Sequence, residues 1–233
     1  METEKTENRF RNIKSYVLRK GRITKGQKSA IERLAPAHLI VPDNVSSVLE
    51  KELSCRRQIV AEIGFGNGEA TAAIAENNPE ILYLAIEVYK PGIGSLLKLI
   101  EERKLENIKI VFHDAVEVFE SLKGKIIFDG FHIFFPDPWH KKKHKKRRLI
   151  NRYFTQLLAE MLKPGGYIFT VTDWEDYSRQ IISEYESNIL LSKADSSISM
   201  PCRSGTRFEE KGIVKNHEVF EILYLRNRVA GQA

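Results

Sequence analysis

The sequence has few of the features that mark secreted, metal-binding or membrane-spanning proteins. Its two cysteines, Cys55 and Cys202, form neither a metal-binding spacing nor a disulfide framework. No run approaches the roughly 20 apolar residues that a membrane helix needs. The first ten residues, METEKTENRF, lack the apolar core of a secretory signal. We therefore expect a cytoplasmic protein with no membrane association.

Acidic side chains are absent from one stretch of the chain and scarce in another. Residues 140–148 read HKKKHKKRR, with seven Lys or Arg, and residues 1–33 carry ten basic and four acidic side chains. Since the whole chain has a net charge of only +6, acids outnumber bases elsewhere. This distribution favours a polyanionic partner over a merely solvated loop and tail. Nucleic acid fits better than a membrane, because neither basic segment continues into a broadly amphipathic helix.

Short apolar runs alternate with amphipathic ones from about residue 57 onward. Strands are predicted over residues 58–63, 82–88, 108–112, 126–135, 167–172, 196–201 and 218–225, and helices over 69–77, 92–104, 115–122, 149–162 and 174–188. The pattern predicts a doubly wound α/β domain over residues 56–233, with a mostly parallel seven-stranded sheet and an antiparallel C-terminal hairpin. Residues 1–55 are interpreted as a basic N-terminal extension with short helical pieces.

A glycine-rich turn, EIGFGNGE at 62–69, joins the first predicted strand to the first helix of the domain. Gly64 and Gly66 let the backbone turn tightly where doubly wound sheets bind ligands. The spacing is not the dinucleotide fingerprint, because the third glycine comes one residue early and Glu62 precedes the first. That carboxylate would repel a pyrophosphate and attract an amino group or a sulfonium. A plain tight turn explains the glycines equally well.

Acidic residues also follow the next two predicted strands. Glu87 lies near the sequence position at which an acid binds ribose hydroxyls, and Asp114 follows the third strand. Each alone is consistent with a solvent-facing carboxylate. Three acids at three consecutive strand ends, however, outline a site for a ribosylated adenine without phosphates. S-adenosylmethionine is such a ligand, and we expect it as the cofactor.

The sequence FFPDPW, at 134–139, follows the fourth predicted strand and leads into the basic run. Prolines on both sides of Asp137 stiffen the backbone. Trp139 offers a flat face for a base or an anchor in the core. A rigid acid beside an aromatic ring, followed by seven cations, suits a displayed nucleobase with its phosphates alongside. The alternative is a proline-rich loop with a helix-capping aspartate.

Two further polar clusters follow the later strands. TDWEDY at 172–177 puts Asp173 at the same sheet edge, where it is also suited to capping the next helix. RSGTRFE at 203–209 lies between the last two predicted strands. His140 and His144 are four residues apart, but they lie among lysines with no carboxylate nearby in the sequence. We therefore expect no metal site.

Together these segments resemble the bacterial tRNA (guanine-N7)-methyltransferases, a class I S-adenosylmethionine-dependent family. The resemblance rests on EIGFGNGE, Glu87, FPDPW with the basic run, TDWEDY and RSGTRFE, and it extends from about residue 58 to the carboxyl end. The glycine turn is generic to methyltransferases, whereas FPDPW with the basic run and TRFE is specific. The chain departs from the family at His140, where proline is common, and this departure removes no motif carboxylate.

The resemblance implies methyl transfer to N7 of guanosine 46 in the variable loop of tRNA. It implies cofactor contacts by Glu62, Glu87, Asp114 and Asp137. It also implies substrate contacts by Lys141, Asp173, Thr206, Arg207, Phe208 and Glu209, and RNA contacts by Lys143, His144, Lys145, Lys146, Arg147 and Arg148. We expect Asp137 to be the catalytic residue that holds the guanine, with Asp173 beside it. The sequence leaves a monomer and a homodimer equally open.

Three other classes remain as alternatives. A dinucleotide-dependent dehydrogenase shares the sheet, but it requires the stricter glycine spacing and no acid at position 62. A DNA amino-methyltransferase usually has two consecutive prolines after the fourth strand, whereas Asp137 separates them here. A non-catalytic RNA-binding module explains the basic segments but leaves the strand-end acids without a role.

Overall fold

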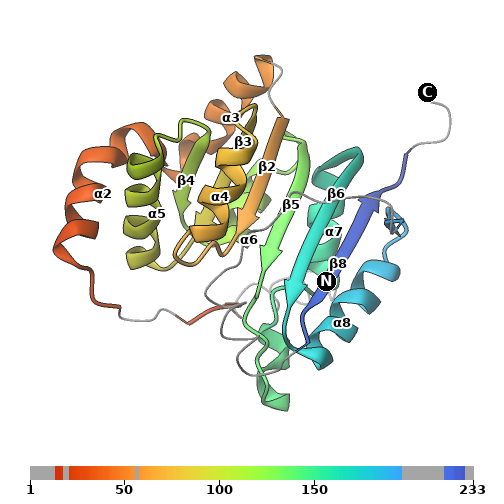
Figure 1. Ribbon diagram of the computed structural model, residues 1–233. Coiled ribbons are helices and arrows are strands. Elements are labelled where there is room, and N and C mark those ends of the chain that lie inside the picture. The colour runs from red at the N-terminus through yellow and green to blue at the C-terminus, as the bar shows by residue number, and fades with distance from the viewer. Residues whose placement is uncertain (1–13, 18–20, 56–57, 196–217, 229–233) are drawn as a thin grey trace, which may run out of the picture.

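The computed structural model describes residues 14–17, 21–55, 58–195 and 218–228 (Figure 1). Its strands are β1 (Leu39–Ile40), β2 (Gln58–Ile63), β3 (Ile81–Glu87), β4 (Ile108–Phe112), β5 (Phe128–Phe134), β6 (Leu162–Thr172), β7 (Leu191–Lys193) and β8 (Phe220–Arg226). Its α-helices are α2 (Lys25–His38), α3 (Val45–Ser54), α4 (Glu69–Asn77), α5 (Lys90–Arg103), α6 (Ala115–Leu122), α7 (Arg152–Met161) and α8 (Glu175–Glu186), and its 3-10 helices are η1 (Pro42–Asn44) and η2 (Lys142–Arg147).

One sheet joins these strands in the order β1-β4-β3-β2-β5-β6-β8-β7. The first six strands in this order, from β1 to β6, pair with one another in parallel, and β8 is antiparallel to both β6 and β7. The predicted α/β fold with its antiparallel hairpin is confirmed. The order of strands reverses between β2 and β5, and doubly wound sheets bind their ligands at this switch point.

Element bounds differ from the predictions where a cap or a pairing partner decides them. The helix expected from residue 149 begins at Arg152, because the Asn151 side chain accepts a hydrogen bond from the Phe154 amide and caps it. The two-residue strand β1 makes the sheet one strand larger than predicted; it is too short to show a periodic pattern and is defined by its pairing with β4. The strand expected at 196–201 lies outside the described residues, and β7 pairs with β8 within them.

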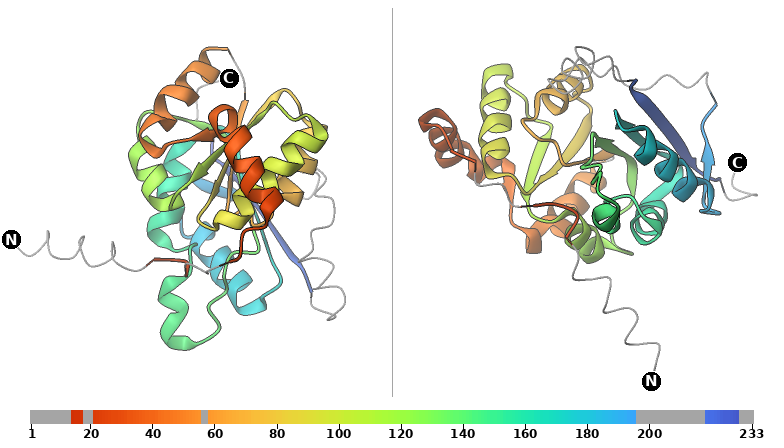
Figure 2. Two further views of the ribbon diagram at one scale, coloured as in Figure 1. Left: turned by 90° about the vertical axis from the view of Figure 1, so that its left-hand side faces the viewer. Right: turned by 90° about the horizontal axis from the view of Figure 1, so that it is seen from below.

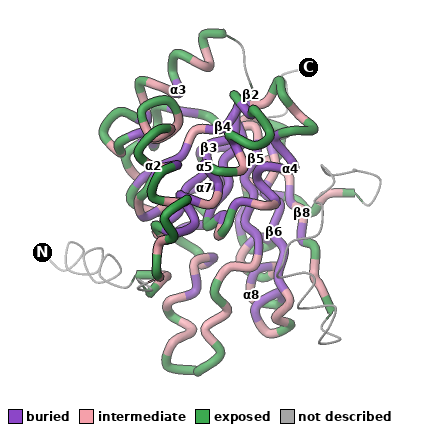
Figure 3. Tube along the Cα trace, turned by 60° about the vertical axis from the view of Figure 1, so that its left-hand side comes forward, coloured by how far each residue is buried: buried purple, intermediate pink, exposed green. Residues whose placement is uncertain are grey.

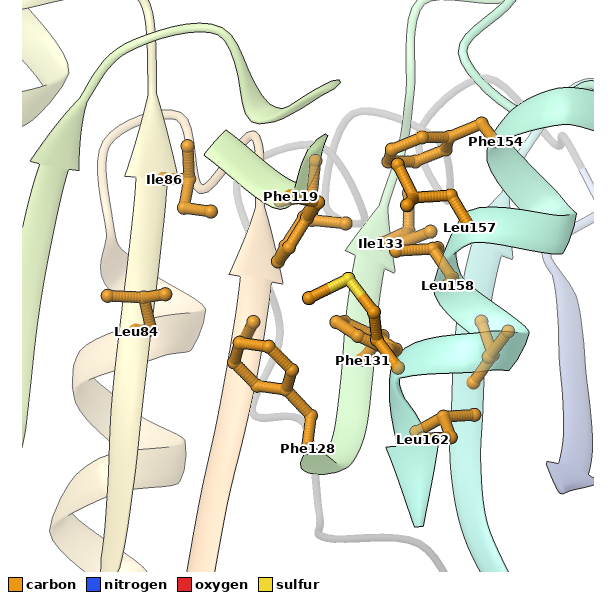
Figure 4. Packing of buried hydrophobic residues seen from close by; sticks show 14 of the residues in the cluster. Leu84, Ile86, Phe119, Phe128, Phe131, Ile133, Phe154, Leu157, Leu158 and Leu162 are labelled. Carbon is orange, nitrogen blue, oxygen red and sulfur yellow. The ribbon is translucent and has the colours of Figure 1, made fainter. Parts of the chain in front are cut away.

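Helices cover both faces of the sheet, so that the parallel strands are buried on both sides (Figures 2 and 3). Apolar side chains from α3, α6, α7 and α8 pack on one face, and those from α2, α4 and α5 pack on the other. Figure 4 shows the core on the face that α3, α6, α7 and α8 cover, where Phe119 of α6 packs edge-on against Phe128 and Phe131 of β5. The buried carboxylates of these strands, Glu62 and Glu87, lie at their carboxyl ends, whereas the buried His132 lies within β5.

The first described helices pack onto the sheet domain. Thr24 and Gln27 form a capping box that starts α2. The Gln27 amide also donates to the Pro91 carbonyl (3.2 Å) and to Ser95 Oγ (2.9 Å), joining α2 to α5. Val45 and Leu49 of α3 are fully buried in the core beside α6. Most of the predicted N-terminal extension, residues 25–54, therefore packs against the helices and the sheet of the predicted domain.

Gly92, in the first turn of α5, lets this helix pass close to the glycine turn after β2. A β-carbon at position 92 would lie 2.0 Å from the carbonyl oxygen of Gly66. Gly66 itself has a φ of 60°, in the left-handed region that favours glycine. The backbone of α5 at Gly92 thus packs directly against the backbone of the glycine turn at Gly66.

We expect Gly92→Ala to destabilise the protein by about 1–3 kcal/mol, because a backbone carbonyl must move to make room for the new methyl group. Alanine would otherwise favour the helix by about 1 kcal/mol. Gly26→Ala in α2 is the matched control, since a β-carbon there would lie 4.0 Å from its nearest neighbours in Lys98. Urea unfolding measures both variants, and equal stabilities would contradict the close fit at Gly92.

Candidate active site

Five acidic residues lie at or just beyond the carboxyl ends of five neighbouring strands. Glu62 is the penultimate residue of β2 and Glu87 the last of β3, whereas Asp114, Asp137 and Asp173 follow β4, β5 and β6. Since these strands are adjacent and parallel, all five acids lie along one edge of the sheet. This arrangement is the one that the sequence predicts.

Glu62 is buried with an unsatisfied carboxylate oxygen. Its side chain is 2% exposed, and Oε2 has no hydrogen-bond partner among the described residues. Burial raises the pKa of this carboxyl to about 7; a hydrogen bond with the Thr71 hydroxyl opposes the rise, and the negative charge of Glu87 adds to it. A buried acceptor without a donor costs stability. A cationic or amino ligand at this position would satisfy it.

Glu87 organises the two loops that border the site. Its Oε2 accepts a hydrogen bond from the Gly66 amide (2.8 Å), and its Oε1 accepts from the Val88 and Tyr89 amides (2.7 and 3.1 Å). Burial raises the pKa of Glu87, and the three backbone donors oppose this rise. Three of about four acceptor positions of the carboxylate are therefore used, which leaves one for a ligand hydroxyl.

Asp114 caps helix α6. Its Oδ1 accepts a hydrogen bond from the Val116 amide (2.9 Å), and the side chain is 8% exposed. Burial raises the pKa of this carboxyl, and the hydrogen bond from Val116 opposes the rise. Asp114 thus combines a capping role with a position at the site.

Asp137 lies on a strained, exposed turn. The residues Phe135 and Trp139 on either side have φ angles of 49° and 44°, which are uncommon for residues other than glycine. Pro136 and Pro138 supply no amide donors. The charge of Asp137 raises the pKa of Glu87, so the exposed acid lies close to the buried one. Such strain typically marks functional turns, and this one presents a carboxylate to solvent beside the site.

The Trp139 ring is held within the protein. Its indole Nε1 donates to the Ser15 carbonyl (2.9 Å), and the Arg147 guanidinium lies over the ring at 4.9 Å from its centre. The His144 ring contacts it edge-on at 5.8 Å. Trp139 therefore anchors the turn and the N-terminal segment, which differs from the predicted alternatives of a base platform and a core residue.

The basic run forms the loop that contains η2, below the carboxyl edge in Figure 1. The side chains of Lys141, Lys142, Lys143 and Lys146 are exposed, and the tip of the loop is green in Figure 3. Arg148 differs, because it is buried and bonded within the protein. Of the residues predicted to contact RNA, Arg148 is thus the one that the fold places in the interior.

The described segments before α2 cross the carboxyl edge of the sheet (Figure 2). Ser15 binds Trp139, which follows β5, and Gly21 lies against the ring of Tyr89, which follows β3. A β-carbon at position 21 would lie 2.4 Å from Tyr89 Oη. These segments therefore bridge the loops on both sides of β2 and its glycine turn.

Four of the predicted substrate contacts, Thr206, Arg207, Phe208 and Glu209, lie outside the described residues. Within the described ranges, no cluster of His, Cys, Asp or Glu is arranged to hold a metal ion. No helix within them is long and apolar enough to cross a membrane.

Sequence reasoning missed two residues that shape the site. Tyr89 receives the N-terminal segment, and Asp176 binds the basic loop through Lys145 and Arg148. Asp176 belongs to the TDWEDY motif, but the motif does not indicate which residues it binds. The only signal in the sequence was the excess of cations in the basic run, which contains both of its partners.

Comparison with known proteins identifies the family. A family model described as "Putative methyltransferase" matches residues 56–222. A tRNA (guanine-N(7)-)-methyltransferase of Acidovorax sp. (strain JS42) is 45% identical over 220 residues, which cover 93% of this chain and 87% of the relative. Another of that name, from Chromobacterium violaceum, is 44% identical over 93% of this chain and 96% of its own length. The chain belongs to the tRNA (guanine-N7)-methyltransferase family.

Solved structures show that this family member has a methyltransferase fold. The aminoglycoside resistance methyltransferase NpmB1 superposes with a TM-score of 0.54 at 16% identity, covering 78% of this chain and 93% of its own. The 16S rRNA methyltransferase KamB gives a TM-score of 0.52 at 13% identity, covering 91% and 98%. At these identities the likeness concerns the fold alone.

The raised pKa of Glu62 predicts a pH-dependent penalty on the stability of this methyltransferase. The folded state binds the Glu62 proton more tightly than the unfolded chain, so stability is lost as the pH rises from about 4.5 through 7. Glutamine cannot ionise, so the Glu62→Gln variant does not lose stability in this way as the pH rises. The difference in unfolding free energy between variant and wild type should therefore grow by about 3 kcal/mol between pH 4 and pH 8. Urea unfolding across this range measures it, and a pH-independent difference would contradict the burial of an ionisable Glu62 carboxyl.

Proposed function

We propose that this protein transfers a methyl group from S-adenosylmethionine to N7 of guanosine 46 in the variable loop of tRNA, in the cytoplasm. The observation that carries the proposal is the row of acids at the carboxyl edge of the sheet, with an exposed loop of cations extending beyond the same edge (Figure 1). The names of the 44–45% identical relatives support the same reaction and substrate. The three other classes do not account for both features.

The buried acids fit S-adenosylmethionine. The unpaired oxygen of Glu62 suits the amino group or the sulfonium charge of this cofactor. Glu87 retains an acceptor position for a ribose hydroxyl, and Asp114 lies where a carboxylate can accept a hydrogen bond from an adenine amino group. Gly64 and Gly66 leave the approach open, because a β-carbon on either residue would meet nothing within 4 Å.

The reaction requires alignment more than proton transfer. When bound, S-adenosylmethionine would supply the methyl group on its sulfonium. Guanine N7 would form the new N–C bond with a lone pair that is already free, while the S–C bond breaks and the neutral thioether leaves. Positive charge therefore develops on the guanine ring as the methyl group arrives. Correct alignment alone can contribute about 7–11 kcal/mol to such a step.

In this proposal Asp137 holds the guanine during the transfer. Its carboxylate can accept hydrogen bonds from guanine N1–H and the exocyclic amino group, and its negative charge stabilises the cation that forms. It is exposed to an incoming base and lies close to the buried Glu87. Asp173, just beyond β6, is its companion on the neighbouring loop, with Lys141 at the start of the basic loop.

The exposed cations of the loop are suited to tRNA phosphates. Lys142, Lys143 and Lys146 point their charge into solvent, and the part-buried His144 and Arg147 flank Trp139. Lysine and arginine contacts with phosphates dominate nucleic-acid affinity and make it salt-dependent. The loop thus supplies affinity for tRNA, whereas the acids at the sheet edge bind the cofactor and the guanine.

The experiment that tests the function is methyl transfer from labelled S-adenosylmethionine to two unmodified tRNA transcripts. One transcript carries guanosine 46 and the other adenosine in its place. We expect label in the first only, recovered as 7-methylguanosine. Equal label in both would refute the target position, and no label in either, despite cofactor binding, would refute tRNA as the substrate.

We expect Asp137→Asn to lower kcat by about 10²–10³-fold, because the substitution removes the charge that stabilises the developing cation. The Kd for tRNA should change little, since phosphate contacts dominate affinity. Glu106→Gln, an exposed acid before β4 at the opposite sheet edge, is the matched control. Single-turnover kinetics and filter binding give the two constants. Wild-type turnover in Asp137→Asn would show that Asp137 does not act on the guanine.

A further inference from the structure

Arg148 is the last cation of the basic run and differs from its neighbours in burial. Its side chain is only 2% exposed, whereas Lys142, Lys143 and Lys146 are exposed. A phosphate could reach Arg148 only if the loop were rearranged. Its position in the interior instead points to a role within the protein.

The guanidinium of Arg148 joins two segments that are distant in the sequence. Nε donates to the Pro138 carbonyl (2.8 Å), Nη1 to Gln180 Oε1 (2.7 Å) and Nη2 to Asp176 Oδ2 (2.6 Å). Its plane also lies over the ring of Tyr177, 4.6 Å from the centre. One side chain thus binds the turn that carries Asp137 and three residues of helix α8.

Asp176 is the charged partner in this arrangement. It also binds the Lys145 ammonium at 2.7–2.8 Å. Hydrogen bonds from Lys145 and Arg148 hold the pKa of Asp176 at about 2, so the carboxylate is ionised in any neutral buffer. A buried guanidinium is tolerated only when it is paired in this way.

The turn needs an external support because its own backbone provides little. Phe135 and Trp139 have positive φ angles, and the prolines at 136 and 138 cannot donate hydrogen bonds. Strained backbone persists only where the surrounding structure holds it. The Pro138 carbonyl directly follows Asp137, and its bond to Arg148 fixes the chain beside that residue.

We propose that Arg148 is a positioning residue that fixes the Asp137 turn against helix α8, and that it does not bind RNA phosphate. Since α8 begins two residues after Asp173, the same contact sets the distance between the two acids that are proposed to hold the guanine. This inference rests on the proposed function insofar as Asp137 acts on the substrate.

Lysine and arginine substitutions separate positioning from phosphate binding. Lysine keeps the charge and can contact a phosphate, but it cannot reach three acceptors in the fixed planar geometry of a guanidinium. If Arg148 positions the turn, Arg148→Lys should lower kcat by about 10- to 100-fold, nearly as much as Arg148→Met does. The affinity for tRNA and its salt dependence should stay at wild-type values in both variants.

The test compares kcat with the slope of log Kd for tRNA against log salt. Arg179→Met is the matched control, because Arg179 lies on the same helix in an exposed pair with Glu175; it should leave both quantities unchanged. Replacing Lys142, Lys143 and Lys146 with alanine should instead change the slope by about 2–3, or 0.7–0.9 per phosphate contact. Normal kcat in Arg148→Lys, with a flatter slope in Arg148→Met, would overturn the proposal in favour of a phosphate contact.

A fluorescence measurement tests the same contact without the reaction. The only two tryptophans of the chain, Trp139 and Trp174, lie at the end of the turn and just before α8. We expect Arg148→Lys to increase acrylamide quenching in the free protein, with an unchanged circular-dichroism spectrum. Unchanged quenching would overturn the proposal. This readout stands even if the transcripts refute the proposed reaction.

Milder variants cover the case in which Arg148 variants fail to fold. Asp176→Asn and Gln180→Ala each remove one partner from a half-exposed position. Each should lower kcat, and their combined effect should be less than the product of the two, because both act through one guanidinium. Gln180→Ala leaves the pair between Lys145 and Asp176 intact, so it should not alter the salt slope. Fully multiplicative effects on kcat, or a changed salt slope in Gln180→Ala, would contradict the proposal.

Discussion

The parallel order of five buried strands is the constraint on which the site depends. Because helices cover both faces of β4-β3-β2-β5-β6, the interior of the sheet accepts mostly apolar side chains. Charged groups are therefore concentrated at the strand ends, and parallel pairing gathers those ends along one edge. Gly64 and Gly66 then let the chain turn at that edge through left-handed backbone angles, and Gly92 lets α5 approach the turn closely. The acids meet because of the sheet, and no long-range ion pair is needed to assemble them.

The buried acids at this edge have different electrostatic situations. The Glu87 carboxylate accepts hydrogen bonds from the amides of Gly66, Val88 and Tyr89. It therefore orders the loops after β2 and β3 without a ligand. Glu62 has an oxygen with no donor among the described residues, and burial raises its pKa towards neutrality. A ligand that brings positive charge to Glu62 therefore relieves a cost that the folded protein carries. This difference explains why one acid is suited to preorganising the site and the other to recognising a cation.

The sequence was sufficient for the fold and for the row of acids, because both follow from local patterns. Strand ends at Glu62, Glu87 and Asp114 are visible from apolar runs and from the residues that follow them. Contacts between distant segments were not predictable in this way. The bond from Trp139 to Ser15 and the pairing of Arg148 with Asp176 join positions without any shared periodicity. Strand β1 was missed for the same reason, since two residues carry no pattern of their own.

The basic run shows how identical charges acquire different roles from their surroundings. In the sequence its seven cations form one block, and charge alone assigns all of them to RNA. In the folded protein the lysines at the tip remain hydrated and free to exchange water for phosphate, at little cost in desolvation. Arg148 differs, because its Nε, Nη1 and Nη2 atoms already donate hydrogen bonds within the protein and the face of its guanidinium lies over the Tyr177 ring. Under the proposed function, affinity for tRNA phosphates and the placement of Asp137 would therefore arise from adjacent residues of one segment, because Arg148, at the end of the basic run, binds the carbonyl of Pro138, the residue after Asp137.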